Sequence, residues 1–184
     1  HRTRFGFARL ALELLHRALD LLRLAGGVAH VALGVLRLAL VVTRAVGNRR
    51  IEGGVRSFLG SGAQAQGRLD DAHAHYTASL AIAREVGEPR DEGWALGRLG
   101  LLRLRAGDFE EAERLITQGE KLLRDAGDPY DLAEILAWKA KAVWRRGDVD
   151  RARSTLAECD ALIAEMGAGP LSEPGKASAA AHAR

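Results

Sequence analysis

Glycine recurs in this chain every 40 residues, in two series that run 20 residues out of phase. Alanine follows each later glycine of the first series by five residues, and a large side chain follows that alanine by four. A fixed period of this length is typical of a repeat protein in which each repeat is one supersecondary unit. The sequence therefore predicts an all-α stack of helical hairpins. The recurring positions are Gly27, Gly67, Gly107 and Gly147, then Gly47, Gly87, Gly127 and Gly167, with Ala72, Ala112, Ala152, Tyr76, Ile116 and Leu156 between them.

The clearest repeat unit covers residues 88–127. A proline and an aspartate open its first helix, helix A, and apolar residues then recur at helical spacing as far as Gly107. Asp108 can cap the second helix, helix B, with Glu111 three residues later in a capping-box arrangement. Gly127 supplies the left-handed residue that ends helix B. We expect this pair of helices to repeat along the chain.

Two further units, residues 48–87 and 128–167, complete a repeat region over residues 47–167. Helix A of the earlier unit contains four glycines, and a glycine inside a helix costs up to about 1 kcal/mol relative to alanine. Gly60 has small residues, Gly100 and Ala140, at the equivalent positions of the other two units. We therefore expect a weak helix A in which Gly60 alone serves close packing. The four glycines are Gly53, Gly54, Gly60 and Gly62.

Residues 1–46 follow the period only in part and predict a degenerate or poorly specified helical segment. Residues 28–46 are far more apolar than any later helix B, and acids that would cap a helix are missing. Three interpretations stay open: a degenerate earlier hairpin, a membrane segment over residues 24–42, or a stretch that is not native coding sequence. Arg37 and His30 interrupt the apolar run, which argues against the membrane.

The end of the chain differs in composition from the repeats. From residue 168 onward it is rich in Gly, Pro, Ser and Ala without an apolar period, so residues 168–184 are predicted to form a disordered, solvated tail. The only methionine is Met166, and His1 falls in the middle of the pattern. Both observations predict a fragment of a longer protein.

Charge and cysteine content argue against several classes of function. The first 46 residues hold seven arginines against two acids, whereas the rest of the chain holds 20 bases and 22 acids, for a net charge of +3 overall. The repeats therefore show no basic stripe for nucleic acid. A single cysteine, Cys159, cannot form an internal disulfide, which favours a reducing cytoplasm. Because it falls where helix B needs a small residue, we expect a packed, unreactive thiol.

The sequence contains no convincing set of catalytic or metal-binding residues. His73 and His75 lie beside two aspartates, but helical residues two apart diverge, and a zinc pair would need a spacing of four. No phosphate-binding loop occurs, and no nucleophile is paired with a base. We expect a chain that is not an enzyme and uses no cofactor or metal.

The hairpin pattern resembles the tetratricopeptide repeat. Helix A of that family carries a large residue and then leucine and glycine, and helix B carries a small alanine, a large residue and another small one. The resemblance covers about residues 48–167 and implies a right-handed α-α superhelix of about three hairpins, preceded by a degenerate one. The matching positions are Leu59, Gly60, Gly67, Leu69, Ala72, Tyr76 and Ser79, then Leu96, Leu99, Gly100, Gly107, Phe109, Ala112, Ile116 and Gly119, and finally Leu136, Ala140, Gly147, Val149, Ala152, Leu156 and Cys159.

Two features depart from the family's usual pattern. The period is 40 rather than 34 residues, as in the longer variant found in kinesin light chains and bacterial multidomain regulators. Lys139 and Arg103 stand where the family usually has leucine and tyrosine. Residues 67–87 look especially similar to the repeat tails of bacterial serine/threonine kinases and signalling ATPases, although no kinase or P-loop motif is present.

In this family helix A lines the concave face, so the resemblance implies a partner-binding surface there. The inward positions of two successive helices A combine tryptophan with bases, a composition typical of protein-binding patches. We expect these residues to bind a protein or peptide: Trp94, Arg98, Leu101, Arg105, Trp138, Lys141, Trp144 and Arg145. The alternative is that the tryptophans pack inside the fold. The family's carboxylate-clamp groove does not carry over, because the matching positions hold Ser57, Ser61, Arg98, Glu134 and Trp138.

The resemblance implies a cytoplasmic interaction scaffold, of a bacterial signalling type, that holds a protein partner. The alternative is a regulatory arm of a serine/threonine kinase or signalling ATPase that acts in cis. The last helix B, predicted over residues 149–166, leaves an apolar flank that could pair with another copy of the chain.

Overall fold

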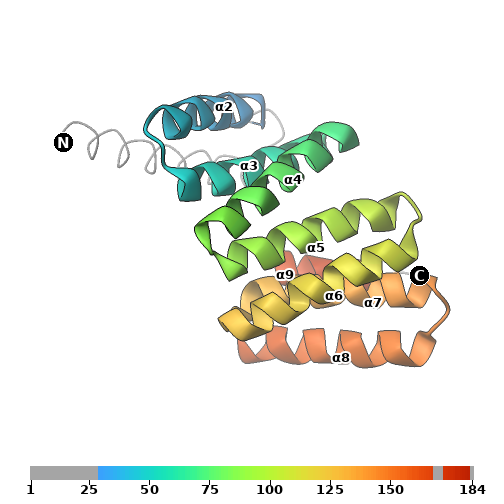
Figure 1. Cartoon of the computed structure of the whole chain (residues 1–184). Helices are drawn as coiled ribbons and strands as arrows, with labels where there is room; N and C mark the ends of the chain where they lie inside the picture. Colours follow the sequence, from blue (N-terminus) through green and yellow to red (C-terminus); the bar gives the residue numbers. More distant parts are fainter. Residues whose placement is uncertain (1–28, 168–171, 183–184) are drawn as a thin grey trace. The chain divides into compact units, whose positions relative to one another are not determined.

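The computed structural model describes residues 29–167 and 172–182, and all the regular structure in these ranges is helical (Figure 1). The chain divides into two compact units, residues 1–87 and 88–184, which are described separately. The all-α repeat fold expected from the sequence is confirmed. The N-terminal unit contains α2 (Ala29–Ala45), α3 (Arg49–Ala65) and α4 (Leu69–Val86); the C-terminal unit contains α5 (Pro89–Arg105), α6 (Phe109–Ala126), α7 (Pro129–Arg145), α8 (Val149–Glu165) and α9 (Glu173–His182).

Glycine ends the helices of the repeats, as the period predicts. Seven glycines, from Gly47 to Gly167 at intervals of 20 residues, have φ angles between +61° and +93°. This left-handed conformation is strained for residues that carry a Cβ, which explains why glycine recurs there. The predicted left-handed stop at Gly127 is confirmed. The 20-residue spacing of glycines in the sequence is therefore the spacing of the helix ends in the structure.

The starts of four helices are fixed by side-chain caps. Asn48, Asp108, Asp128 and Asp148 each accept a hydrogen bond from the backbone N–H three residues later, at 2.9 to 3.3 Å. Such a cap satisfies one of the N–H groups that a helix leaves unpaired at its start. The second hydrogen bond of the predicted capping box, from the Asp108 N–H to the Glu111 carboxylate, does not form, because Glu111 accepts hydrogen bonds from Arg114 instead.

The two helices of each hairpin make their closest approach at equivalent positions of the repeat. The Ser79 hydroxyl of α4 donates to the Gly53 carbonyl of α3 at 2.9 Å, and the Cys159 thiol of α8 contacts the Ala133 carbonyl of α7 at 3.1 Å. The middle hairpin has glycine on both sides of this approach, Gly93 on α5 and Gly119 on α6. Small residues at these positions therefore set the distance between the paired helices.

Helix α3 is regular throughout, despite its four glycines. A Cβ on Gly60 would lie 2.6 Å from the Tyr76 ring, as expected from its small equivalents, but one on Gly62 would lie 2.5 Å from Leu33 and one on Gly53 3.0 Å from Ile82. The prediction that Gly60 alone serves close packing is therefore wrong. Only Gly54 has open space around it. Three of the glycines admit neighbouring helices, and this contact compensates for their poor helix propensity.

Helix α2 belongs to the N-terminal unit and packs on α3. Leu33 and Leu36 of α2 join Val55 and Leu59 of α3 in one buried cluster. Within the described residues, no helix has both the length and the apolar run that crossing a bilayer requires. A first helix of the predicted early hairpin would fall before residue 29, outside the described residues.

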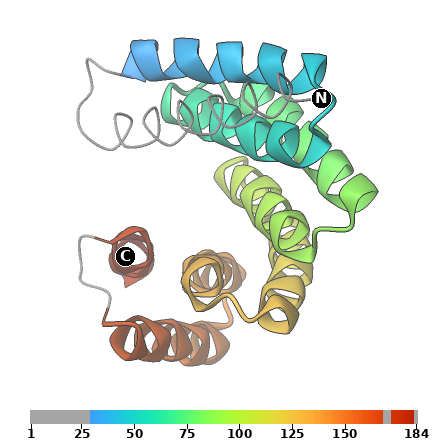
Figure 2. The ribbon, with the colours of Figure 1, turned by 90° about the vertical axis from the view of Figure 1, so that its left-hand side faces the viewer.

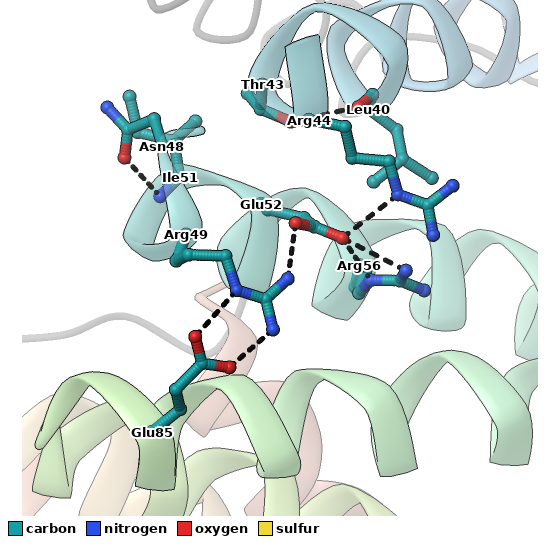
Figure 3. A network of polar contacts seen from close by, with 9 residues as sticks. All are labelled: Leu40, Thr43, Arg44, Asn48, Arg49, Ile51, Glu52, Arg56 and Glu85. Atoms are coloured by element: carbon teal, nitrogen blue, oxygen red, sulfur yellow. Dashed lines mark hydrogen bonds and ion pairs between the residues drawn. The ribbon is translucent and has the colours of Figure 1, made fainter. Parts of the chain in front are cut away.

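A buried carboxylate links α2, α3 and α4 (Figure 3). Glu52 of α3 is only 3% exposed and accepts hydrogen bonds from Arg44 at 3.1 Å, Arg49 at 2.6 Å and Arg56 at 3.0 Å. Arg49 continues the network to Glu85 of α4 through two further hydrogen bonds. Burial raises the pKa of Glu52, but the three arginine hydrogen bonds outweigh it and hold that pKa below its ordinary value of 4.5.

The predicted disordered tail contains a helix. Residues 173–182 form α9, which lies beside α7 and α8 (Figure 2; α9 is the red helix marked C). The Ser172 hydroxyl accepts the N–H of Gly175 and caps its first turn. Pro174 is fully buried, and Ala177 and Ala181 pack against the core of the C-terminal unit. The tail prediction was based on the lack of an apolar period, whereas α9 docks through proline and alanine.

Cys159 is completely buried between α7 and α8, as its small-residue position suggests. Burial, with the nearby Asp160 carboxylate, raises the pKa of its thiol from 9.0 to about 11. A pKa higher by about two units lowers the thiolate fraction at pH 8 about a hundredfold. We therefore expect Cys159 to react with a disulfide reagent at least about a hundredfold more slowly in the folded chain than in urea. Equal rates in the two states, measured against a free thiol in each buffer, would contradict this.

Candidate interaction groove

An arginine lies against two tryptophans where α5 meets α7. The rings of Trp94 and Trp138 have centroids 5.7 Å apart and planes inclined by 42°. The Arg98 guanidinium lies 4.3 Å from the Trp94 centroid and 5.0 Å from that of Trp138, within the range of cation–π attraction. Its Nη2 is 3.6 Å from the Glu134 carboxylate. These side chains thus form a cluster that joins successive helices A.

Beside this cluster, the C-terminal unit contains a groove with a volume of about 590 Å³, called here the helix A groove. Five of the eight residues predicted to bind a partner line it: Leu101, Arg105, Trp138, Lys141 and Arg145. Its other lining residues were not among those predicted to bind a partner, and they combine apolar positions of α5 to α7 with α9. These are Leu104, Ala106, Gly107, Phe109, Ala137, Ala177, Ala180 and Ala181.

The helix A groove is basic. Three of its lining residues are cationic and none is acidic. Within the described parts of the chain no carboxylate pairs with Arg105, Lys141 or Arg145, although the Arg145 guanidinium lies 5.6 Å from the Trp144 ring. The groove therefore presents apolar surface bordered by positive charge.

Other charged residues of the same unit are paired between helices. Lys139, one of the two departures from the family pattern, binds Glu120 of α6 at 2.5 Å. Glu113 of α6 binds Arg146 at 2.6 Å and Arg151 at 2.7 Å. Both glutamates are buried, so loss of their cations, which belong to the next hairpin, would leave a buried charge without a partner. The groove cations have no such structural role in the described chain.

The remaining predicted site residues lie elsewhere. Trp94 and Arg98 belong to the aromatic cluster and do not line the groove. Trp138 is only 8% exposed, so it is mainly a core residue, as the alternative interpretation held. Trp144 is 41% exposed and lines a second pocket, with Val149 and Leu156. The sequence analysis grouped all three tryptophans in one binding surface, whereas packing separates Trp144 from the other two.

No metal site is evident in the described ranges, where no three His, Cys, Asp or Glu side chains gather to hold an ion. His75 is half-buried, and burial with the nearby Arg56 charge lowers its pKa. His73 is exposed on the same helix. The two histidines thus lie in different surroundings.

The geometry defines a class of protein, a helical-repeat chain with a groove along its A helices. Residues 55–125 match the tetratricopeptide repeat family model. Repeats of this family act as scaffolds for protein–protein interaction and are generally not catalytic. A search of curated proteins found no significant match to the sequence.

Solved structures share the fold at low sequence identity. Aspartyl phosphate phosphatase F from Bacillus subtilis matches with a TM-score of 0.77 and 13% identity, over 94% of this chain and 48% of that one. BtubC (BKLC) from P. vanneervenii matches with a TM-score of 0.65 and 16% identity, over 78% of this chain and 59% of its own. A putative kinesin light chain of Podosopora anserina, with nearly identical TPR-like repeats, matches with a TM-score of 0.63 and 16% identity, over 92% of this chain and 80% of that one. The chain thus spans about half to three fifths of the first two structures.

Proposed function

We propose that this chain is a non-catalytic scaffold whose helix A groove binds an acidic helical segment of a partner protein. The observation that carries this proposal is the set of three cations that line an apolar groove without a carboxylate partner. Cations that remain exposed to water raise the free energy of the unbound chain little. Across an interface they attract and orient a segment of opposite charge. The partner is therefore expected to carry glutamate or aspartate at the borders of an apolar face.

A helical segment fits this surface better than an extended one. The groove has no free strand edge to extend, and the α7 face already accepts one helix, α9. An amphipathic helix placed in an apolar groove is a common mode of peptide recognition. Leu101 and Trp138 would contact its apolar face, while Arg105, Lys141 and Arg145 would pair with its acids.

A displayed library of helical peptides tests this proposal. The peptides are about 18 residues long, which is enough for helix formation, with glutamate or lysine at border positions and alanine, leucine or phenylalanine on the face. Selection on the full chain is expected to enrich glutamate at the borders. The double variant Arg105→Glu, Lys141→Glu should weaken the most enriched peptide at least about tenfold and should itself select lysine.

Lys121→Glu provides the matched control, because Lys121 is exposed on α6 and does not line the groove. Lys121→Glu changes the charge at one site by the same amount as each substitution of the double variant. Peptides selected on it should still be enriched in glutamate. Circular dichroism checks that each variant is folded. Selection without charge preference, or identical peptides from the native chain and the double variant, would rule out the groove as the binding site.

The alternative function, a regulatory arm that acts in cis, uses the same groove. It differs only in the source of the helix that binds there. A kinase or ATPase domain on the same polypeptide would supply the acidic helix at high effective concentration. Self-association through the exposed flank of α8 is a separate proposal. It is supported by Trp144 and Val149, which are 41% and 40% exposed beside Leu156. Sedimentation of the full chain over a range of concentrations measures it directly.

A further inference from the structure

Helix α9 forms one wall of the helix A groove. Ala177, Ala180 and Ala181 line it opposite the side chains of α5 and α7. Figure 2 shows α9 beside α7, with which it shares most of its contacts in the unit. The helix that the sequence did not predict therefore lies on the surface proposed to bind a partner.

The open part of the groove is small for a helical partner. A helix about 10 Å wide that rises 5.4 Å per turn occupies roughly 420 Å³ per turn. The groove of about 590 Å³ thus has room for only about one and a half turns beside α9. Because the groove is open on one side, a longer helix fits only partly beside α9, and one that enters to its full width requires the space in which α9 lies.

The contacts that hold α9 suit a reversible cover. The Ser178 hydroxyl donates to Asp160 Oδ1 of α8 at 2.5 Å, and His182 Nε2 lies 3.0 Å from Asp160 Oδ2. Against the groove α9 places only alanine, which buries little apolar area and offers no charge to the three cations. Its ten residues are also fewer than the about 12 to 15 that an isolated helix needs, so α9 gains its helical state by docking.

We propose that α9 is an intramolecular cover of the helix A groove, which the acidic partner helix displaces; this inference rests on the proposed function of the groove. The partner pairs with Arg105, Lys141 and Arg145, and this gain offsets the contacts that α9 loses. The apparent affinity for the partner is then reduced by the fraction of molecules in which α9 is docked. Partner binding and α9 docking exclude one another.

Two neighbouring substitutions in the full chain test the cover. Ser178→Glu places a carboxylate against Asp160 at a buried position of α9, and like charges there should release the helix. Ala179→Glu adds the same charge at the next, exposed position and should leave α9 docked. Amide hydrogen exchange over residues 173–182 measures docking without any ligand, and exchange is expected to rise in Ser178→Glu alone.

The binding probe is the most enriched glutamate peptide from the library described above. Ser178→Glu should bind it about tenfold more tightly than the native chain, and Ala179→Glu should remain within about twofold of native. In the native chain, adding the peptide should speed exchange in α9 and slow it in α7. Circular dichroism and tryptophan fluorescence, which reports the C-terminal unit, check that both variants are folded.

Each of the other outcomes refutes either the cover or the proposed function of the groove. If α9 stays protected in Ser178→Glu, or is released without a gain in affinity, the cover is refuted and the groove function stands. Weaker binding on release would make α9 a fixed wall of the site. If α9 is released and no library peptide binds either form, the groove function itself is refuted.

Discussion

Replacing Gly119 with alanine is expected to destabilise the C-terminal unit by about 2 to 3 kcal/mol. A Cβ at this position would lie 2.5 Å from the Gly93 carbonyl oxygen and 3.2 Å from the Gly97 backbone nitrogen. Backbone atoms cannot rotate away as a side chain can, so α5 and α6 must separate. The separation would also loosen the contact of Gly97 with Ile135 of α7.

The equivalent positions of the other hairpins limit this cost. Ser79 and Cys159 both carry a Cβ at the same point of the repeat and are accommodated opposite Gly53 and Ala133. The fold therefore tolerates a wider hairpin, and Gly119→Ala should remain folded with reduced stability. Urea unfolding followed by tryptophan fluorescence measures the change, because all three tryptophans lie in the C-terminal unit.

Gly54→Ala is the matched control, since a Cβ there meets no atom within 4 Å. It replaces a glycine inside α3 and should stabilise the chain by up to about 1 kcal/mol, measured by circular dichroism. Equal effects of the two substitutions would mean that helix propensity, rather than the close approach of α5 and α6, explains glycine at position 119.

Replacing Glu52 with glutamine is expected to destabilise the N-terminal unit by about 2 kcal/mol at neutral pH. Glutamine keeps the size of the side chain but loses the charge that accepts hydrogen bonds from Arg44, Arg49 and Arg56. Hydrogen bonds to a buried charge are stronger than those to a neutral amide. Arg44 joins α2 to α3 through this carboxylate, so the packing of α2 should weaken first.

This contribution depends on pH. The pKa of Glu52 is lower in the folded chain than its ordinary value of 4.5, so the folded state binds fewer protons than the unfolded state in this range. The stabilisation is therefore complete above about pH 5 and is lost as pH falls through the folded pKa. Unfolding of the native chain and Glu52→Gln, compared at a series of pH values, should converge in acid.

Glu85→Gln serves as the control for this network. Glu85 also binds Arg49, but it is exposed on α4, and exposed ion pairs contribute only about 0 to 1 kcal/mol. It should therefore change stability much less than Glu52→Gln. A difference between native and Glu52→Gln that stays constant down to about pH 3 would show that the carboxylate charge is not the cause.

The candidate site was predictable in part because it follows from helical spacing. Leu101, Arg105, Lys141 and Arg145 lie on one side of two equivalent helices, so helical spacing groups them once the family resemblance indicates which side faces inward. Helical spacing does not indicate how deeply a side chain is buried, and Trp138 is mainly a core residue. The start of α9 did have a signal, since Ser172 and Pro174 precede an alanine-rich stretch. Its lack of large apolar residues concealed that it docks.

The sequence by itself determined where the repeat helices end and where four of them begin, because left-handed glycines and side-chain caps act through bonds to residues three or four positions away. Local chemistry of this kind repeats whenever the residues repeat. Only the tertiary structure decided that Gly53 and Gly62 admit neighbouring side chains, that three arginines share Glu52, and that α9 lines the groove. Those contacts join residues from different helices, and their energies depend on burial and distance that no sequence period specifies.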